Sequence, residues 1–248
     1  MNRILFEAGE IIDGKAMFGG VRAEHVITVL HGEVGQILKT GEIDGQIGTS
    51  VIERIDGTPA EPKVTVRVSH GERSLQPWVD LVLAPPRPRV LKRLLPQLAA
   101  LGVGTVVLVG AKKVEKDFWG ATLLKAENYR PLLLDGLMQA GTSVMPVLEV
   151  RRNFRAFVRD ELESMLSSRR RIVAHPHCAD GSKTAIGSGD GGGRLVVAIG
   201  PEGGWTDEEL ELLGTNGFVR RSLGRRILRT DTATVALLAQ LMGEEDRA

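Results

Sequence analysis

The stretch LVVAIGPEGGWTDEELELL, residues 195–213, decides the fold class of this 248-residue chain. It opens with an apolar run of strand type that ends at a Gly-Pro pair. Gly203 and Gly204 would permit the positive φ angles of a sharp turn, and Thr206 and Glu209 have the spacing of a capping box. The stretch therefore predicts a buried strand, a tight turn and a helix. Open α/β sheets place ligands at such an edge, although the turn is equally compatible with a plain connection.

Outward from this stretch, strands and helices alternate from Val79 onward. The segments VDLVLA, TVVLVG, SVMPVLEV and RIVAH read as strands, and helices are expected around 129–140 and 154–166. Between the first two strands, RVLKRLLPQLAALG places five leucines on one helical face before Gly102, although Pro96 would weaken that helix. The alternation predicts a mostly parallel sheet with helices on both faces. The leucines are Leu91, Leu94, Leu95, Leu98 and Leu101.

The amino-terminal part has a different texture. QILKT, QIGTSVIERI and VTVRVSH are short alternating segments separated by glycine turns, which predicts a small β-barrel. HVITVLHG, residues 25–32, is the one helix-like exception. Because the texture changes near 71–77, we expect two domains, 1–72 and 73–248.

Composition restricts the functional classes. A net charge of +1 gives the whole chain little attraction for a polyanion, so nucleic-acid affinity would have to come from local arginine and lysine clusters. No apolar run is long enough to span a membrane, and neither an export signal nor a membrane partner is expected. Cys178 is the single cysteine, which favours a reduced compartment such as the cytoplasm.

Two other motifs are set aside. A GxGxxG pattern at Gly187, Gly189 and Gly192 precedes a strand, whereas a dinucleotide fingerprint must follow one, so a surface loop is expected. His177 and Cys178 lie close to His175, but no further pair completes a ligand set, and no metal site is predicted. The sequence also lacks a P-loop and a GxSxG nucleophile elbow.

A second segment strengthens the binding interpretation. SLGRRILRTDTA, residues 222–233, supplies another glycine turn at Gly224 and apolar residues before a helix that starts near 230–232. Two such turns at one sheet edge could form an adenosine pocket, with backbone groups reading the base and apolar side chains forming the walls.

Together, AIGPEGG and SLGRRILRTDTA resemble the paired cofactor motifs of the 16S ribosomal RNA uracil-N3 methyltransferases, a family of the knotted SPOUT class. AHP at 174–176, PPRPRVLKRLLPQLAALGV, VEKDFW and the amino-terminal HVITVLHGEVGQILKTGEIDGQIG are similar to further parts of the family, the last to its PUA-like RNA-binding barrel. The likeness covers nearly the whole chain. It implies an α/β trefoil-knotted methyltransferase domain behind a PUA-like β-barrel.

The resemblance also implies the partners and the site. It indicates S-adenosyl-L-methionine as cofactor, 16S ribosomal RNA or the small ribosomal subunit as substrate, and a homodimer. Leucines of the last helix would lie in the dimer interface or in the core of one chain. The implied cofactor residues are His175, Pro176, Ile199, Gly200, Glu202, Gly203, Leu223, Gly224, Ile227, Leu228, Thr232 and Ala233.

The chemistry points to one arginine. Uridine N3 loses its imide proton during methylation, and a guanidinium can stabilise the charge that develops on the carbonyl oxygens although it cannot act as the base. Arg229 is the candidate, with a structural pairing to Asp231 or Glu202 as its alternative role. Candidate RNA contacts are Arg3, Arg22, Arg89, Lys92, Arg93 and Lys116.

Two other functions stay open. A knotted methyltransferase for another RNA or base atom would keep the cofactor motifs, whereas a non-catalytic RNA-binding or ribosome-assembly protein would need only the barrel and the basic patches.

Overall fold

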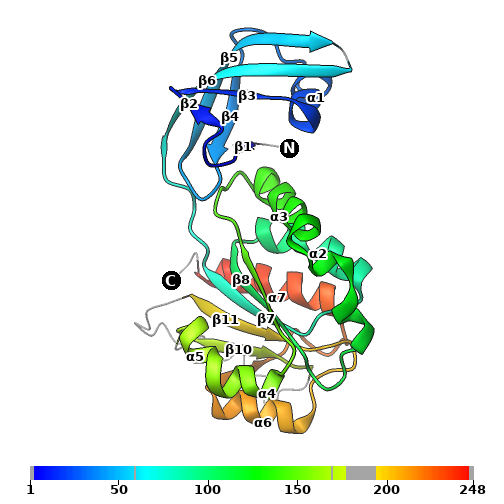
Figure 1. Cartoon of the computed structure of the whole chain (residues 1–248). Helices are drawn as coiled ribbons and strands as arrows, with labels where there is room; N and C mark the ends of the chain where they lie inside the picture. The colour runs from blue at the N-terminus through cyan, green and yellow to red at the C-terminus, as the bar shows by residue number, and fades with distance from the viewer. Residues whose placement is uncertain (1–2, 59, 169, 177–193, 246–248) are drawn as a thin grey trace. The chain divides into compact units, whose positions relative to one another are not determined.

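In the computed structural model of the chain, the described residues are 3–58, 60–168, 170–176 and 194–245. They divide into two compact units (Figure 1). The first contains residues 1–76 and 134–145, and the second contains 77–133 and 146–248. The segment 134–145, which the sequence-based boundaries place in the second domain, packs with the first unit. The expectations for Cys178 and for the glycines at 187–192 lie outside the described residues.

The first unit is built on a six-stranded sheet in the order β1-β4-β5-β6-β3-β2. Its pairs are antiparallel except for β1 with β4, which are parallel. A core of alternating inward side chains, including Phe6, Phe18, Ile52 and Val66, lies against one short helix. The elements are β1 (Ile4–Phe6), β2 (Ile11–Ile12), β3 (Lys15–Phe18), α1 (Gly20–Thr28), β4 (Ile37–Glu42), β5 (Ile47–Thr58) and β6 (Glu61–Glu72).

The helix of this unit corrects the sequence-based expectation. HVITVLHG was expected to be helical over 25–32, but α1 spans Gly20–Thr28. Ala23 and Val26 form its buried face, and His31 adopts a positive φ of 49° after the helix ends. At Gly32 a Cβ atom would lie 2.6 Å from a Val26 side-chain atom, so the chain turns back onto the helix where a longer helix would have continued.

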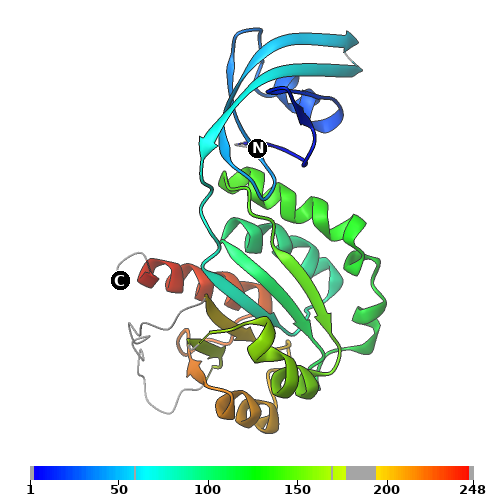
Figure 2. The ribbon, with the colours of Figure 1, turned by 60° about the vertical axis from the view of Figure 1, so that its left-hand side comes forward.

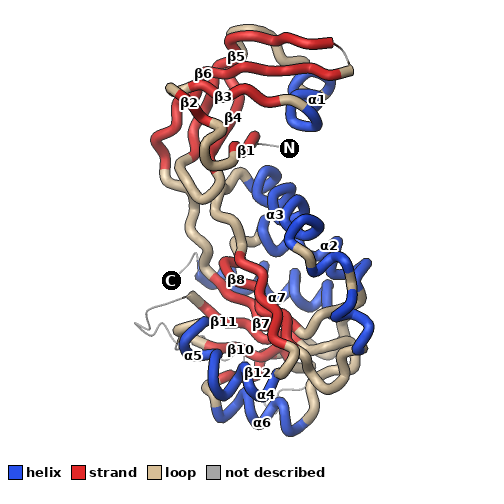
Figure 3. The backbone as a smooth tube through the Cα atoms, in the orientation of Figure 1, coloured by secondary structure: helices blue, strands red, loops and turns tan. Residues whose placement is uncertain are grey.

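The second unit contains the predicted parallel sheet. Its strand order is β12-β10-β11-β7-β8-β9, and every pair is parallel. Figure 3 shows these strands as neighbouring red segments. The strands are β7 (Val79–Leu83), β8 (Val103–Val109), β9 (Val147–Arg151), β10 (Arg171–Ala174), β11 (Leu195–Ile199) and β12 (Phe218–Arg221).

Helices cover both faces of this sheet, as expected from the alternation. In Figures 1 and 2, α2 (Pro88–Ala100) and α7 (Thr230–Glu245) lie on one face, and α4 (Phe154–Ala156), α5 (Leu162–Met165) and α6 (Asp207–Thr215) lie on the other. Because both faces are covered, β7 and β11 are buried along their whole length. The turns η1 (Lys116–Gly120) and η2 (Thr122–Leu124) and helix α3 (Ala126–Ala140) follow β8.

Three details differ from the sequence-based expectations. Helix α2 continues through Pro96, and its four leucines at 91, 94, 95 and 98 are buried. The expected strand SVMPVLEV begins only at Val147, because Ser143 is buried in the first unit and its hydroxyl donates to the Gly45 carbonyl oxygen at 2.8 Å. The expected helix over 154–166 is interrupted by a π-helical turn, η3 (Phe157–Glu161), whose Phe157 and Val158 are buried.

Candidate functional site

Three neighbouring strands of the second unit end side by side and form the floor of a pocket. β11 is followed by the segment Gly200–Trp205, β10 by His175 and Pro176, and β12 by the segment 222–229. Because β12, β10 and β11 are adjacent and parallel, their carboxyl ends meet at one edge of the sheet. Ligands of open α/β sheets bind at this kind of edge.

Ser222 ties two of these strand ends together. Its hydroxyl lies 3.0 Å from the carbonyl oxygen of Pro176 and accepts the backbone N–H of Gly224 at 3.1 Å. Gly224 has a φ of +116°, a conformation that a residue with a Cβ atom rarely adopts. The second glycine turn of the sequence is therefore a real constraint on the backbone beside the pocket.

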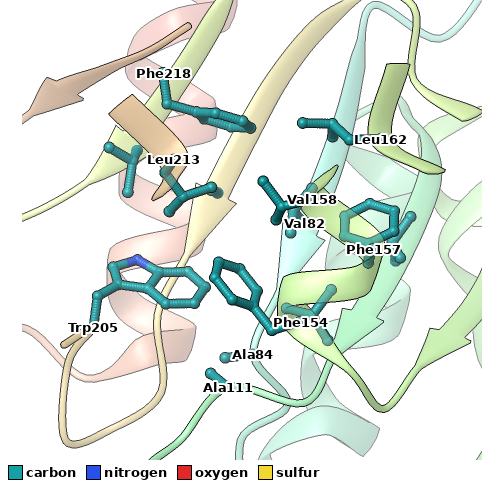
Figure 4. Close-up of a cluster of buried hydrophobic side chains, with 14 of the residues drawn as sticks. Val82, Ala84, Ala111, Phe154, Phe157, Val158, Leu162, Trp205, Leu213 and Phe218 are labelled. Atoms are coloured by element: carbon teal, nitrogen blue, oxygen red, sulfur yellow. The ribbon is translucent and has the colours of Figure 1, made fainter. Parts of the chain in front are cut away.

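The Trp205 side chain packs against the turn after β11. This side chain is only 6% exposed, and its ring lies 5.2 Å from the ring of Phe154 (Figure 4). A Cβ atom on Gly200 would lie 3.0–3.1 Å from the indole, so this glycine is needed for close approach to Trp205. Among the described residues, the buried Nε1 of Trp205 has no hydrogen-bond partner.

The two other glycines of the turn have different roles. Gly204 has a φ of +71°, as expected, but the expectation of a positive φ at Gly203 was wrong. At Gly203 a Cβ atom would meet the Lys113 side chain at 3.0 Å, and the Lys113 ammonium donates to the Gly203 carbonyl oxygen at 2.8 Å. Close packing of a side chain is therefore the reason for this glycine.

The predicted capping box is confirmed and does more than start α6. The Thr206 hydroxyl accepts the N–H of Glu209, and one carboxylate oxygen of Glu209 accepts the N–H of Thr206 at 2.8 Å. The other carboxylate oxygen accepts the N–H of Lys112, just after β8, at 2.7 Å. The 5%-exposed Glu209 thus joins the turn after β11 to the loop after β8.

The resulting pocket has a volume of about 380 Å³, within the usual range for small-molecule sites. All the cofactor residues expected from the sequence line it, except Thr232. The tryptophan directly after GPEGG was an available signal that sequence reasoning missed. The lining residues absent from the predicted set are Ala174, Pro201, Gly204, Trp205, Arg221, Arg226 and Thr230. The predicted residues that line it are His175, Pro176, Ile199, Gly200, Glu202, Gly203, Leu223, Gly224, Ile227, Leu228 and Ala233.

Polar contacts close the rim and floor of this pocket. Buried Arg221 is paired with Glu244 of α7, and the Thr230 hydroxyl lies 3.4 Å from the Gly200 carbonyl oxygen. Among the described residues, no group bonds to the backbone N–H groups of Ile227 and Leu228. Apolar lining residues and unpartnered backbone N–H groups thus occur together in the 227–228 segment of the pocket lining.

Arg229 is exposed and lies between two pocket residues, Leu228 and Thr230, without lining the pocket itself. The two carboxylates considered as its structural partners are paired elsewhere. Asp231 accepts from Arg93 at 3.3 Å, and Glu202 lies 3.9 Å from Arg87. Within the described ranges, the Arg229 guanidinium has no ion pair, so nothing in the fold occupies its charge.

The candidate RNA-binding residues fall into two groups. Arg89, Lys92, Arg93 and Lys116 have exposed side chains in the second unit. In the first unit, the Arg3 guanidinium donates to three backbone carbonyl oxygens, and Arg22 forms a two-pronged pair with Glu10 while lying over two phenylalanine rings. Both arginines thus have structural contacts whatever else they bind.

The described part of the chain contains neither a metal-type cluster nor a membrane-spanning helix. No group of three or more His, Cys, Asp or Glu residues there is arranged to hold a metal ion. His177 and Cys178, neighbours of His175, lie outside it. None of the described helices combines the length and the apolar character that a membrane crossing requires.

Comparison with known proteins agrees with this geometry. The profile of the RNA methyltransferase domain matches residues 73–242, which includes every lining residue of the pocket. A Legionella pneumophila methyltransferase, solved with bound SAM, is 26% identical and superposes with a TM-score of 0.74 over 98% of this chain and 97% of that one. A Neisseria gonorrhoeae ribosomal RNA small subunit methyltransferase E is 18% identical with a TM-score of 0.72, over 98% and 97% of the two chains, and shares the fold.

The sequence comparison narrows the class further. Ribosomal RNA small subunit methyltransferase E of Treponema pallidum is 32% identical over 248 residues, covering 98% of this chain and 91% of the relative. The chain therefore belongs to the ribosomal RNA small subunit methyltransferase E family.

Proposed function

We propose that this chain methylates N3 of a uridine in the RNA of the small ribosomal subunit, with S-adenosyl-L-methionine as methyl donor. The observation that carries the proposal is the pocket at the carboxyl ends of β10, β11 and β12. Residues of both motifs, AIGPEGG and SLGRRILRTDTA, line this pocket. Support comes from the family of the chain and from the Legionella pneumophila relative, whose structure holds SAM.

The residues present fit an adenosine-type ligand. Ile199, Leu223, Ile227 and Leu228 provide apolar walls for a base, and the pocket volume of about 380 Å³ suits a nucleoside with a short extension. The backbone N–H groups of the 227–228 segment, which lines the pocket, have no partner in the described chain. Such groups favour a ligand that offers hydrogen-bond acceptors.

The methyl donor brings the electrophilic methyl group, so the protein has to position the uridine and stabilise charge. Arg229 is our candidate for the second task. Its guanidinium remains protonated and can stabilise the negative charge on the uridine carbonyl oxygens as the N3 proton leaves. The target base must be unpaired for its Watson–Crick edge to reach the pocket. The methylation rate should therefore rise with pH until another step limits it.

RNA recruitment is assigned to cations outside the pocket. We infer that the first unit is a PUA-like RNA-binding barrel to which Arg3 and Arg22 contribute, and that Arg89, Lys92, Arg93 and Lys116 contact phosphates from the second unit. The exposure of the last four side chains supports this role.

Three further features complete the proposal. We infer that the carboxyl-terminal segment is threaded in a trefoil knot, that the protein acts as a homodimer and that it works in the cytoplasm. Leu237, Leu238 and Leu241 of α7 are fully buried within the single chain, which supports their role in its core. The dimer contact would then use other faces of that helix, for example around the 36%-exposed Met242.

Cofactor binding is tested by calorimetry with S-adenosylhomocysteine on the wild type and on Gly224→Val. The variant should bind at least about tenfold more weakly, because a β-branched residue cannot keep the φ of +116° beside the pocket. Gly217→Val is the matched control, since Gly217 also has a positive φ, +83°, but does not line the pocket. Equal losses in both variants, or no loss in either, would contradict the assignment of the pocket.

The position of the methyl group is tested separately by mapping N3-methyluridine in ribosomal RNA from a strain that lacks this protein. Loss of one N3-methyluridine from the small-subunit RNA, restored by the wild-type chain, is the expected result. Loss of a different modification would indicate another base atom or another RNA. Cofactor binding without any methylation change would favour the non-catalytic assembly role.

A further inference from the structure

A second cavity lies at the same sheet edge, on the other side of the turn after β11. Its volume is about 390 Å³. Trp205 lines the first pocket and the next residue, Thr206, lines the second, so one turn separates the two. Three cations line the second cavity, namely Lys112, Arg152 and Arg155.

The loops that carry Lys112 and Arg152 are in backbone contact. Gly110, at the end of β8, donates its N–H to the Arg151 carbonyl oxygen at 2.9 Å. A Cβ atom at position 110 would lie 1.9 Å from the Arg152 carbonyl oxygen, so the loops after β8 and β9 are in contact there. The Lys112 and Arg152 side chains therefore start from two loops that are joined by a backbone hydrogen bond.

The charges of the cavity are only partly compensated. Arg155 is paired with Glu208, and both carboxylate oxygens of Glu209 accept backbone N–H groups. The Arg152 guanidinium donates to the Trp119 carbonyl oxygen at 3.3 Å and has no carboxylate partner in the described chain. The Lys112 ammonium likewise has no partner among the described residues. Lys112 and Arg152 are thus two cations without a carboxylate partner among the described residues, and the cavity, with three cations and two carboxylates, has a net charge of +1.

We propose that this cavity binds a phosphate of the substrate RNA, with Lys112 and Arg152 as the contacting residues. The inference rests on the proposed function, because the RNA must pass the first pocket for its uridine to be methylated. A guanidinium fork and an ammonium group suit a phosphodiester oxygen pair, and such contacts fix the register of an RNA strand without reading its sequence. The bound phosphate would fix the RNA strand on one side of the turn after β11, with the methyl donor on the other side.

The test measures the binding of in vitro transcribed 16S ribosomal RNA to the full chain over a range of salt concentrations. Lys112→Ala and Arg152→Ala should each weaken binding by about tenfold at low salt and reduce the slope of log K against log salt by about 0.7–0.9. Arg159→Ala is the matched control, since Arg159 is an exposed cation of the following helical segment that lines neither cavity. It should leave both quantities unchanged.

Calorimetry with S-adenosylhomocysteine on the same preparations separates this inference from the proposed function. If the wild type binds both ligands and the two variants keep its salt slope, the phosphate site is overturned while the proposed function stands. A wild type that binds neither ligand contradicts the proposed function itself. Should Arg152→Ala unfold, Lys112→Ala decides alone, because the backbone N–H that donates to Glu209 is retained. Lys112→Ala could instead keep the wild-type slope of log K against log salt and bind a ribosomal protein more weakly. That result would overturn the RNA assignment in favour of a protein contact.

Discussion

Arg3 and Arg22 of the first unit differ in their contacts from the cations beside the two cavities of the second unit. In the first unit, Arg3 is enclosed by carbonyl oxygens of Thr40, Gly48 and Gly141, and Arg22 is held by Glu10. In the second unit, Lys112, Arg152 and Arg229 are exposed and have no carboxylate partner among the described residues, whereas Arg221 is buried and paired with Glu244. Cations that are already bonded in the fold stabilise it, whereas cations left exposed are available for a ligand. The comparison predicts that removal of a bonded cation lowers stability, whereas removal of an unpaired cation beside a cavity lowers activity.

The largest effect is expected at Arg229, which has no ion pair in the described chain. Arg229→Ala should lower the single-turnover methylation rate by about 100-fold to 1,000-fold, as for the loss of one donor to a developing oxyanion. Cofactor affinity and thermal stability should stay close to those of the wild type. Arg229→Lys should restore only part of the rate, because an ammonium lacks the planar fork. A rate loss explained wholly by cofactor affinity would make Arg229 a binding residue.

Arg3 provides the opposite case. Arg3→Ala should lower the free energy of unfolding of the first unit by about 2–3 kcal/mol, because it leaves several carbonyl groups without a donor. Lys39→Ala is the control, since Lys39 is an exposed cation of β4. Chemical denaturation, monitored by amide hydrogen exchange of residues in the first unit, measures this change in the free energy of unfolding. Equal stability of the two variants would mean that water replaces the guanidinium without cost.

A smaller stability effect is expected at Arg22, with a defined pH dependence. The hydrogen bond from Arg22 lowers the pKa of Glu10. A lowered carboxyl pKa adds stability above the unfolded-state pKa, and this contribution is lost as the pH falls through the folded-state value. Arg22→Ala should therefore cost about 1–2 kcal/mol at neutral pH and less in acid. If the difference in the free energy of unfolding between wild type and variant stays constant from neutral to acidic pH, this account is contradicted.

The smallest effect per residue is expected on the surface of α2. Replacement of Arg89, Lys92 and Arg93 together by alanine should weaken RNA binding and flatten its salt dependence, with cofactor affinity unchanged. Arg93 should contribute least, because it is already paired with Asp231. Salt titrations of the triple variant and of Arg93→Ala alone measure this. An unaltered salt slope in the triple variant would place the RNA elsewhere.

Much of the second unit was predictable because its signals are local. The apolar run of β11, the capping box of Thr206 and Glu209, and the leucine face of α2 depend only on neighbours in the sequence. The cofactor residues could be grouped because two turn motifs of known chemistry occur together. Strands β1 to β3 and β12, which have two to four residues each, were not predicted from the sequence.

Long-range contacts set the rest. Nothing local distinguishes Gly203, which packs against Lys113, from Gly204, which needs its positive φ. The shared loop junction at Gly110 and Arg152 joins strands that are far apart in the sequence, so the basic cavity could not be recognised from RRNFR alone. The structural contacts of Arg3 and Arg22 could not be predicted for the same reason, because charge is visible in a sequence and its partners are not.

Glu209 illustrates how little substitution a bonding pattern can tolerate. Its two oxygens accept N–H groups from two separate loops, Lys112 on one side and Thr206 on the other. Glutamine would turn an amide donor toward one of these donors, and aspartate would be one methylene too short to span them. Alanine would leave both N–H groups without a partner in a buried place. Glutamate alone offers two acceptor oxygens on a side chain long enough to reach both N–H groups. We therefore expect random mutagenesis with selection for function to return glutamate at this position.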